Sequence, residues 1–483
     1  MKVLLVTGRL ASGQVKRCAC GADVLVEDVD VAAFITPEML CRSGPRGYDL
    51  ILIPGAITAD FRDAEKALGT RIRLGPKHAI DLASILPCLD EVELSTTVPA
   101  CALMEEKRSK EAIIQLEGLE AQACGQLTLK GVKIGGSSRM KVLAEIVDAT
   151  RLDELALKEK IRYFEGQGAD LIDLGASIDA TPASVKRAIE TAKEATLLPI
   201  SIDAVRPELI FAGIEAGADM ILSLNGENLP LVGRTVAEAG IPAVVIPGPG
   251  SVTLEENLAR ARGYSIQAIA DPVLDPPLMG LARSLNRYIH FRDSEPDVPL
   301  FFGVGNVTEL MDADSPGANL LLSVLGSEVG ASLLFTPEYS AKAMGSIHEL
   351  AVASRMVVLA QCRQTPPKDL GLDLLILKEK RRIFEEPLPT GVVEASKEHE
   401  YQPDSAGSFR ILLSGGKILA INGKITVAGT SARDILNTLI DLGLVSRLDH
   451  AGYLGRELER AQIALQLGRS YIQDEPLWQR KVK

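Results

Sequence analysis

The sequence predicts an α/β protein with a central eight-stranded parallel (β/α)8 TIM barrel, flanked by an N-terminal doubly wound α/β domain and a small C-terminal α+β domain. Three observations support this fold class. Eight short apolar runs follow one another between residues 142 and 335, most are separated by enough chain for a crossover helix, and most end in a polar residue. Parallel strands need such crossovers, and eight strands can close a barrel.

The apolar runs are short and nearly continuous, as expected for parallel strands that are buried on both faces. Eight of them with helices between favour a closed barrel over an open sheet. We expect this domain to span residues 131–362. The eight predicted strands are Val142–Val147, Asp170–Leu174, Pro199–Ile202, Asp219–Leu224, Ala243–Ile246, Gln267–Ala270, Pro299–Gly303 and Gly330–Phe335.

The flanking segments predict two further domains. Residues 1–130 contain two strand-then-turn units, Val3–Gly8 and Tyr48–Gly55, which are typical of a doubly wound α/β domain of the flavodoxin or Rossmann type. Residues 363–408 are rich in polar residues and proline and predict a linker. Residues 409–483 predict an α+β domain with hairpin strands at Phe409–Leu413 and Ile418–Val427 and helices at Ala432–Leu442 and Gly455–Gly468.

Composition narrows the classes of partner. The formal net charge is −12 and the basic run Lys380-Arg381-Arg382 is short, which gives little reason to expect a nucleic acid or an anionic membrane as a partner. No apolar run of about 18 residues is available to span a bilayer. The seven cysteines form no even framework, which predicts a cytoplasmic protein with reduced thiols. The five histidines show no paired spacing, so we expect no metal site.

Polar residues stand where the predicted barrel strands end, and these ends converge on one cavity in such a barrel. Carboxylates and amides with few bases suit a neutral heterocycle that presents N–H donors. The alternative is that each residue caps the following helix, where Asp and Asn are favoured. The candidate binding residues are Asp148, Asp173, Asp203, Asn225, Asp271 and Asn306.

Three motifs in the barrel are similar to those of dihydropteroate synthases. Gly168–Gly175 resembles their second-strand motif, and Pro199–Asp203 followed by Glu215–Asp219 resembles their third and fourth. The resemblance covers about 220 residues, and the whole chain resembles the archaeal dihydropteroate synthase-related proteins. It implies recognition of a reduced pterin of the folate or tetrahydromethanopterin type, with Asp173, Asp203 and the strand-four amide contacting the ring.

The chain departs from the synthases where a pyrophosphate leaving group would need positive charge. Leu222-Ser223 stands in place of an Asn-Asp pair, Phe301–Val307 lacks the lysine of strand seven, and Thr336–Tyr339 lacks a basic pair. Two segments instead resemble methyltransferases that move a methyl group from a reduced pterin to a corrinoid: Ala144–Asp148 and Gly303–Val307.

The resemblance therefore implies a pterin-dependent transferase of one-carbon metabolism or of pterin biosynthesis. Asp203 and Asp148 are the candidate catalytic residues, because an acid near the pterin nitrogen would organise the proton that activates it as a leaving group. Three alternatives stay open: a methyltransferase with a corrinoid or corrinoid protein as partner, a dihydropteroate synthase proper, and a non-catalytic pterin carrier or sensor. The resemblance is also compatible with a homodimer. His450 is either a base or corrinoid ligand, or a helix-start residue paired with Asp449.

Overall fold

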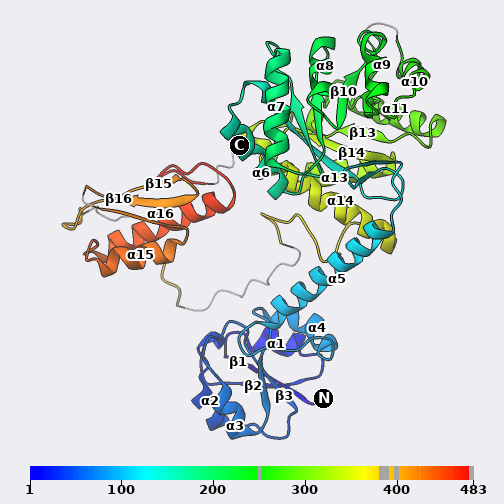
Figure 1. Ribbon diagram of the computed structural model, residues 1–483. Helices are drawn as coiled ribbons and strands as arrows, with labels where there is room; N and C mark the ends of the chain where they lie inside the picture. The colour runs from blue at the N-terminus through cyan, green and yellow to red at the C-terminus, as the bar shows by residue number, and fades with distance from the viewer. Residues whose placement is uncertain (249–251, 380–390, 396–401, 424, 478–483) are drawn as a thin grey trace. The chain divides into compact units, whose positions relative to one another are not determined.

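The computed structural model describes residues 1–248, 252–379, 391–395, 402–423 and 425–477 (Figure 1). The chain forms two compact units, Met1–Phe384 and Glu385–Lys483. The first unit holds an open parallel sheet and a closed barrel, and the second holds a small antiparallel sheet with two helices. The predicted fold class is confirmed.

The N-terminal sheet is doubly wound. Its four parallel strands are ordered β2-β1-β3-β4, and side chains alternate between its two faces. Leu4 and Val6 pack with the helices α2 and α3, whereas Val3 and Leu5 pack with α1 and α4. The elements are β1 (Val3–Thr7), α1 (Ser12–Cys18), β2 (Asp23–Val26), α2 (Pro37–Ser43), β3 (Leu50–Ile53), α3 (Arg62–Leu68), β4 (Arg71–Leu74) and α4 (Leu82–Ile85).

All eight predicted barrel strands are present, and no observed end differs from its prediction by more than one residue. The strands pair in parallel and close in the order β10-β11-β12-β13-β14-β7-β8-β9. They are β7 (Lys141–Ile146), β8 (Leu171–Gly175), β9 (Ile200–Asp203), β10 (Met220–Leu224), β11 (Ala243–Val245), β12 (Ala268–Ala270), β13 (Leu300–Gly303) and β14 (Ala331–Thr336).

Helices cover the outside of the barrel, and alternate strand residues divide between its two sides. Outward residues such as Ile172 and Ile202 pack against the helices, whereas Leu171, Met220 and Phe301 form an inner apolar core. The helices are α6 (Glu154–Gly166), α7 (Pro182–Ala195), α8 (Pro207–Glu215), α9 (Leu229–Glu238), α10 (Leu254–Gly263), α11 (Leu281–Ser294), α12 (Gly305–Thr308), α13 (Ser315–Glu328) and α14 (Ser346–Arg363).

A hairpin that the sequence did not predict closes the N-terminal end of the barrel. It follows the long helix α5 (Ala100–Gln122) and consists of β5 (Leu127–Leu129) and β6 (Val132–Ile134). Its three buried residues, Leu127, Leu129 and Ile134, belong to the inner core of the barrel. The expected domain boundary between residues 130 and 131 falls in the turn of this hairpin, where both residues have positive φ.

Helix α14 is a core helix of the barrel. Among the described helices, only the segment Ala341–Arg363, which contains it, is long and apolar enough to cross a membrane, and 67% of that apolar window is buried in the protein. The predicted linker, residues 363–408, lies partly outside the described residues, which omit 380–390 and 396–401. Its first part is packed, because Leu370 is buried against α5 and α14. The domain limits therefore stay predictions.

The second unit has the predicted hairpins. Strands β15 (Arg410–Ser414), β16 (Lys417–Ile421) and β17 (Thr426–Gly429) are antiparallel and pack on α15 (Ala432–Asp441) and α16 (Leu448–Gln466). Helix α16 begins seven residues before the predicted start at Gly455. The helix continues through Gly452 and Gly455 because the buried Leu454 between them anchors it in the core, which offsets the cost of about 1 kcal/mol per glycine.

We predict that Ile134→Ala lowers the free energy of unfolding by about 2–5 kcal/mol, because it leaves a cavity in a fully buried site of the barrel plug. Urea denaturation followed by circular dichroism measures this change. Ile114→Ala is the matched control, since Ile114 is 68% exposed on α5 and should cost less than ~0.5 kcal/mol. Equal effects of the two substitutions would show that the hairpin does not support the barrel.

Candidate functional site

Three carboxyl groups lie on adjacent strands inside the barrel, near the ends where the chain leaves for the helices. Glu145 of β7 pairs in register with Asp173 of β8, and Asp203 of β9 pairs with Gly175. The side chains of Glu145 and Asp173 point into the barrel, because side chains alternate along a strand and Leu143 and Leu171, two residues earlier, belong to the inner core. Asp271 follows β12 and adds a fourth carboxyl group to this end of the barrel.

Asp173 is the most enclosed of these acids. Its side chain is fully buried, and its Oδ1 accepts a hydrogen bond of 2.5 Å from the Ser201 hydroxyl. Its other oxygen, Oδ2, is buried without a hydrogen-bond partner among the described residues. Burial raises the pKa of Asp173 well above its ordinary value, and the charges of Asp203 and Glu145 raise it further. An unsatisfied buried acceptor of this kind is costly and calls for a donor.

Asp203 is held by a serine that a β-bulge turns inward. The pairing of β10 with β11 shifts register between Ile221 and Leu224, and Ser223 has a φ of 66°. The Ser223 hydroxyl donates to Asp203 Oδ1 at 2.7 Å, and the next residue, Leu224, packs in the outer core. Bulges often re-aim a side chain beside a functional site. Burial raises the pKa of Asp203, although the bond from Ser223 opposes this shift.

Glu145 is the residue that the sequence analysis missed as a site residue. Burial raises its pKa to about 7, and the like charges of Asp203, Asp148 and Glu309 contribute. The predicted site residues follow strand ends or, like Asp173, belong to a motif that resembles the synthases, whereas Glu145 lies within β7. One feature of the sequence could have indicated Glu145. It is a charged residue in an otherwise apolar strand, two positions after Leu143, and its side chain therefore points to the same side as that of Leu143.

Asp271 is fixed by its own loop and by the barrel wall. Its Oδ1 accepts hydrogen bonds from the Val273 backbone N–H at 2.8 Å and from the Tyr288 hydroxyl at 2.9 Å. Burial raises the pKa of Asp271 to about 6, although the two hydrogen bonds oppose the shift. The two bonds use one carboxyl oxygen, which leaves the second for another donor.

The remaining predicted site residues have more local roles. Asp148 has a φ of 52°, is about half exposed and forms an ion pair of 2.9 Å with Arg151. Asn225 is buried, and its Oδ1 accepts from the backbone N–H groups of Glu227 and Asn228 in the turn before α9, whose N-cap is Asn228 and not Asn225. Asn306 is exposed, and its amide donates to the Leu274 carbonyl at 2.9 Å, which leaves its oxygen as an acceptor.

Several bases around the mouth are neutralised by acids. Arg151 pairs with Asp148 and Asp179, and the pairs Arg287–Asp275 and Lys342–Asp312 follow the same pattern. Arg206 pairs with Glu208 and donates to the Ala180 carbonyl. Arg260, an exposed residue of α10, lies beside Gly226 in the loop after β10. Among the described residues, the interior at this mouth therefore presents carboxyl and hydroxyl groups, and the bases named here lie at its rim. The buried Lys141 lies at the opposite end of β7 and pairs with Glu120.

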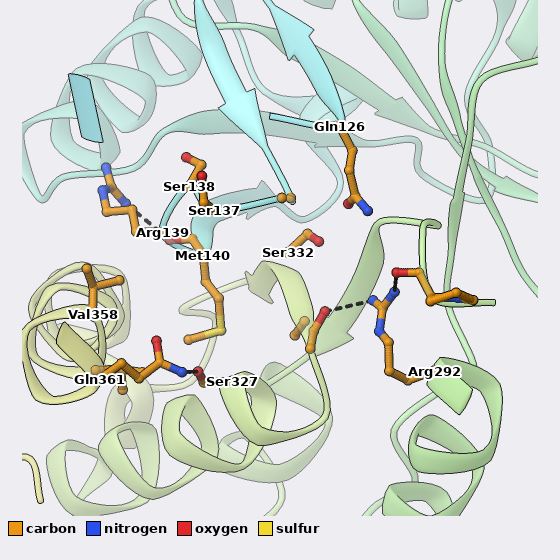
Figure 2. Close-up of a pocket in the computed structure, with 16 residues that line it drawn as sticks. Gln126, Ser137, Ser138, Arg139, Met140, Arg292, Ser327, Ser332, Val358 and Gln361 are labelled. Atoms are coloured by element: carbon orange, nitrogen blue, oxygen red, sulfur yellow. Dashed lines mark hydrogen bonds between the residues drawn. The ribbon is translucent and has the colours of Figure 1, made fainter. Parts of the chain in front are cut away.

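A cavity of about 410 Å³ lies at the opposite, N-terminal end of the barrel (Figure 2). Figure 2 shows Gln126, Ser332 and Arg292 around it. Arg292 donates to the carbonyls of Glu295, Pro296 and Gly330 at 2.7–3.2 Å, so it ties together the loops at this end. The carboxyl groups are not among its lining residues. This cavity is therefore separate from the acidic site, and residues at this face of such barrels serve stability.

In the second unit, His450 is held by a distant aspartate. Its Nδ1 is 2.8 Å from Asp404 Oδ2. The predicted pairing of the His450 side chain with Asp449 is therefore wrong. Asp449 accepts the backbone N–H of His450, and its side chain pairs with Arg447. Hydrogen bonds, first from the Ser446 hydroxyl, hold the pKa of Asp404 below its ordinary value. Asp404 lies 46 residues earlier in the chain, in the predicted linker.

Comparison with known proteins identifies the class of this barrel. Residues 148–261 match the family described as pterin binding enzyme, and residues 403–474 match PterinBD-DUF4346. The barrel is thus a pterin-binding barrel of the dihydropteroate synthase type. A Methanocaldococcus jannaschii protein described as uncharacterized is 36% identical over an alignment 523 positions long. The alignment covers 99% of each chain. The chain belongs to the family of this archaeal protein, the dihydropteroate synthase-related proteins.

Weaker similarities concern parts of the chain. A Ycf91-like protein of Nostoc is 37% identical over 68 residues, covering 12% of this chain and 54% of that protein. A Yersinia pestis dihydropteroate synthase in complex with a sulfonamide drug is 16% identical, covers 50% of this chain and 99% of its own, and has a TM-score of 0.41. A Coxiella burnetii dihydropteroate synthase in complex with pteroic acid is 20% identical, covers 47% of this chain and 98% of its own, and has a TM-score of 0.38.

We predict that Asp173→Asn stabilises the ligand-free protein at pH 8 but not near pH 4. The raised pKa means that the folded protein binds more protons than the unfolded one above about pH 4, so wild-type stability falls as the pH rises toward the folded pKa. Asparagine cannot ionise and escapes this loss. Thermal melting at both pH values measures the difference.

Asp219→Asn is the control for this measurement. Asp219 lies at the N-terminal end of β10 and pairs with Lys130 at 2.8 Å, so its loss should lower the melting temperature at pH 8. Destabilisation by Asp173→Asn at pH 8 would contradict the raised pKa of Asp173.

Proposed function

We propose that this protein is a transferase that acts on a reduced pterin of the folate or tetrahydromethanopterin type. The unpartnered Oδ2 of Asp173 carries the proposal, because it is a buried acceptor inside the barrel and requires an N–H donor from a ligand. The aminopyrimidinone edge of a pterin presents several N–H donors side by side. The family matches support a pterin as the ligand.

The proposed role of each residue depends on how buried its side chain is and on which of its polar atoms have no partner. Asp173 and Asp203 bind the donor edge of the ring, because Asp173 is fully buried and each of the two is held by a serine. Asp271 and Asn306 have one oxygen left as an acceptor, whereas Asn225 offers mainly its amide N–H2 group. Asp148, at the open side, is accessible to the part of the pterin that reacts.

Methyl transfer is the reaction that the charges favour. A synthase must stabilise a pyrophosphate leaving group, which needs fixed positive charge. Here the rim bases Arg151, Arg287 and Lys342 are paired with acids. Methyl transfer releases no pyrophosphate, so this reaction is compatible with an acidic barrel. Within this proposal the protein is cytoplasmic, in keeping with its seven free cysteines.

The second unit favours a corrinoid as methyl acceptor. A histidine that binds a metal usually donates its other ring N–H to a carboxylate, and Asp404 provides that carboxylate for His450. No described residue hydrogen-bonds the other nitrogen, Nε2. A corrinoid carries most of the ligands of its own metal, so a single protein nitrogen would be sufficient to hold it. His450 is the residue that would hold it.

We predict that Asp203→Ala abolishes binding of methyl-tetrahydropterin, measured by anaerobic calorimetric titration of the full chain. The loss removes a buried acceptor, which costs at least ~10-fold in affinity. Asp312→Ala is the control, because Asp312 is 97% exposed at the rim and should leave affinity unchanged. Unchanged binding in Asp203→Ala, with the fold intact by circular dichroism, would remove the barrel-mouth site.

The same titration with hydroxymethyl-dihydropterin diphosphate separates methyl transfer from pteroate synthesis. Preference for the diphosphate would support a synthase and would assign the phosphates to Arg260, so Arg260→Ala should then remove that preference. Binding of the methyl form without turnover with any acceptor would support a carrier or sensor. Binding of neither ligand would refute the pterin proposal.

We predict that the full chain shifts the visible spectrum of aquocobinamide, which has no nitrogen base of its own, and that His450→Ala abolishes the shift. Asp404→Asn should weaken it, because the imidazole loses its carboxylate partner. His290→Ala is the control, since His290 bonds only a backbone carbonyl of its own helix. A wild-type spectrum unchanged by the protein would exclude this ligand role.

A further inference from the structure

Glu145 differs from the other acids of the barrel because nothing holds its carboxyl group. Asp173 is bound by Ser201, Asp203 by Ser223 and Asp271 by Tyr288, whereas no described residue hydrogen-bonds the Glu145 side chain. Glu145 is partly exposed to solvent, whereas Asp173 is fully buried. A structural acid in a barrel wall would be paired. Glu145 is therefore positioned for a ligand rather than for the fold.

The backbone leaves space for this carboxyl group. Gly175 of β8 lies beside it, and a Cβ at that position would stand 3.1 Å from Glu145 Oε1. That approach is tight, so any larger residue at Gly175 would press on the carboxyl group. Glu145 thus stands at the level of Asp173, directly above the apolar inner core.

All the charged groups that interact with Glu145 are acidic. They are Asp203 of β9, Asp148 directly after β7, Glu309 after α12, and Asp173, whose own pKa Glu145 raises. Burial and these charges bring the pKa of Glu145 to about 7, where a group both gives and regains a proton at neutral pH. Burial and the charges of Asp203 and Glu145 also raise the pKa of Asp173, but Asp173 is sealed and its Oδ1 is held by Ser201, so Glu145 is the more accessible of the two acids.

We propose that Glu145 holds a proton in the ligand-free barrel and donates it to the pterin nitrogen that loses the methyl group. This inference rests on the proposed methyl transfer. The nitrogen–methyl bond breaks, the methyl group goes to the nucleophilic acceptor, and the bonding electron pair stays on the nitrogen. The proton of Glu145 then joins that nitrogen, directly or by way of Asp203. Glu145 is left as a carboxylate, and water at the mouth protonates it again.

The first test needs no activity. Infrared spectra of the ligand-free full chain between pH 5 and 9 should show a protonated carboxyl band that is lost with a midpoint of about pH 7, and Glu145→Gln should remove that band. Glu309→Gln is the matched control: it removes a neighbouring charge, so the band should remain with a lower midpoint. A band with this midpoint that survives in Glu145→Gln, or no band with this midpoint in the wild type, would overturn the proposal.

The second test follows a single turnover with methyl-tetrahydropterin and free cob(I)alamin as acceptor. Wild-type methyl transfer should slow as the pH rises above about 7, and Glu145→Gln should be about 100-fold slower and lose that dependence. Its affinity for methyl-tetrahydropterin should stay within a few-fold of wild type, which a merely structural role would not explain. A persisting pH dependence in Glu145→Gln would refute the donor role.

The two tests separate this inference from the proposed function. A wild-type protein that binds methyl-tetrahydropterin but transfers no methyl group would refute methyl transfer and the donor role together. The infrared result would still decide whether Glu145 holds the proton. A wild-type protein that transfers the methyl group equally fast at pH 6 and pH 9 would keep the proposed function and overturn the inference alone.

Discussion

The repulsion between carboxyl groups enclosed in one barrel is the constraint on which the site depends. Glu145, Asp173 and Asp203 lie on adjacent strands, and like charges in a buried place cannot all ionise. The ligand-free site therefore retains protons or is strained, and hydrogen bonds from Ser201 and Ser223 relieve only part of the cost. A ligand with several N–H donors removes the strain. The acids thus favour donor-rich ligands over anions, since Lys141, a buried base of β7, is paired with Glu120 at the other end of the strand.

The apolar interior below makes this repulsion effective. The hairpin of β5 and β6 closes the N-terminal end, and its apolar side chains join the inner core. Charge interactions are stronger where water is excluded, so this core raises the influence of each acid on its neighbours. The polar loops around Arg292 lie at the plugged end, where Arg292 ties them together through backbone carbonyls. The plug and the acidic groups therefore lie at opposite ends of the barrel.

The strands were predictable because parallel strands buried on both faces leave continuous apolar runs in the sequence. Asp203 was predicted because it directly follows an apolar run, and Asp173, which lies within β8, because its strand resembles the second-strand motif of the synthases. Glu145 was missed because it lies within a strand, where only the alternation of inward and outward residues reveals it. The inward turn of Ser223 depends on a register shift, which the sequence does not show. The pairing of His450 with Asp404 joins distant segments and has no local pattern.

The position of Asp404 affects how the second unit can be studied in isolation. The predicted domain starts at residue 409, at the first strand, and a fragment cut there would contain every helix and strand of the unit. It would nevertheless lack the carboxylate that fixes His450 and that also accepts the backbone N–H groups of Ser446 and Arg447. Such a fragment would present a histidine free to rotate. Any property measured on it would describe a different imidazole from the one in the intact protein.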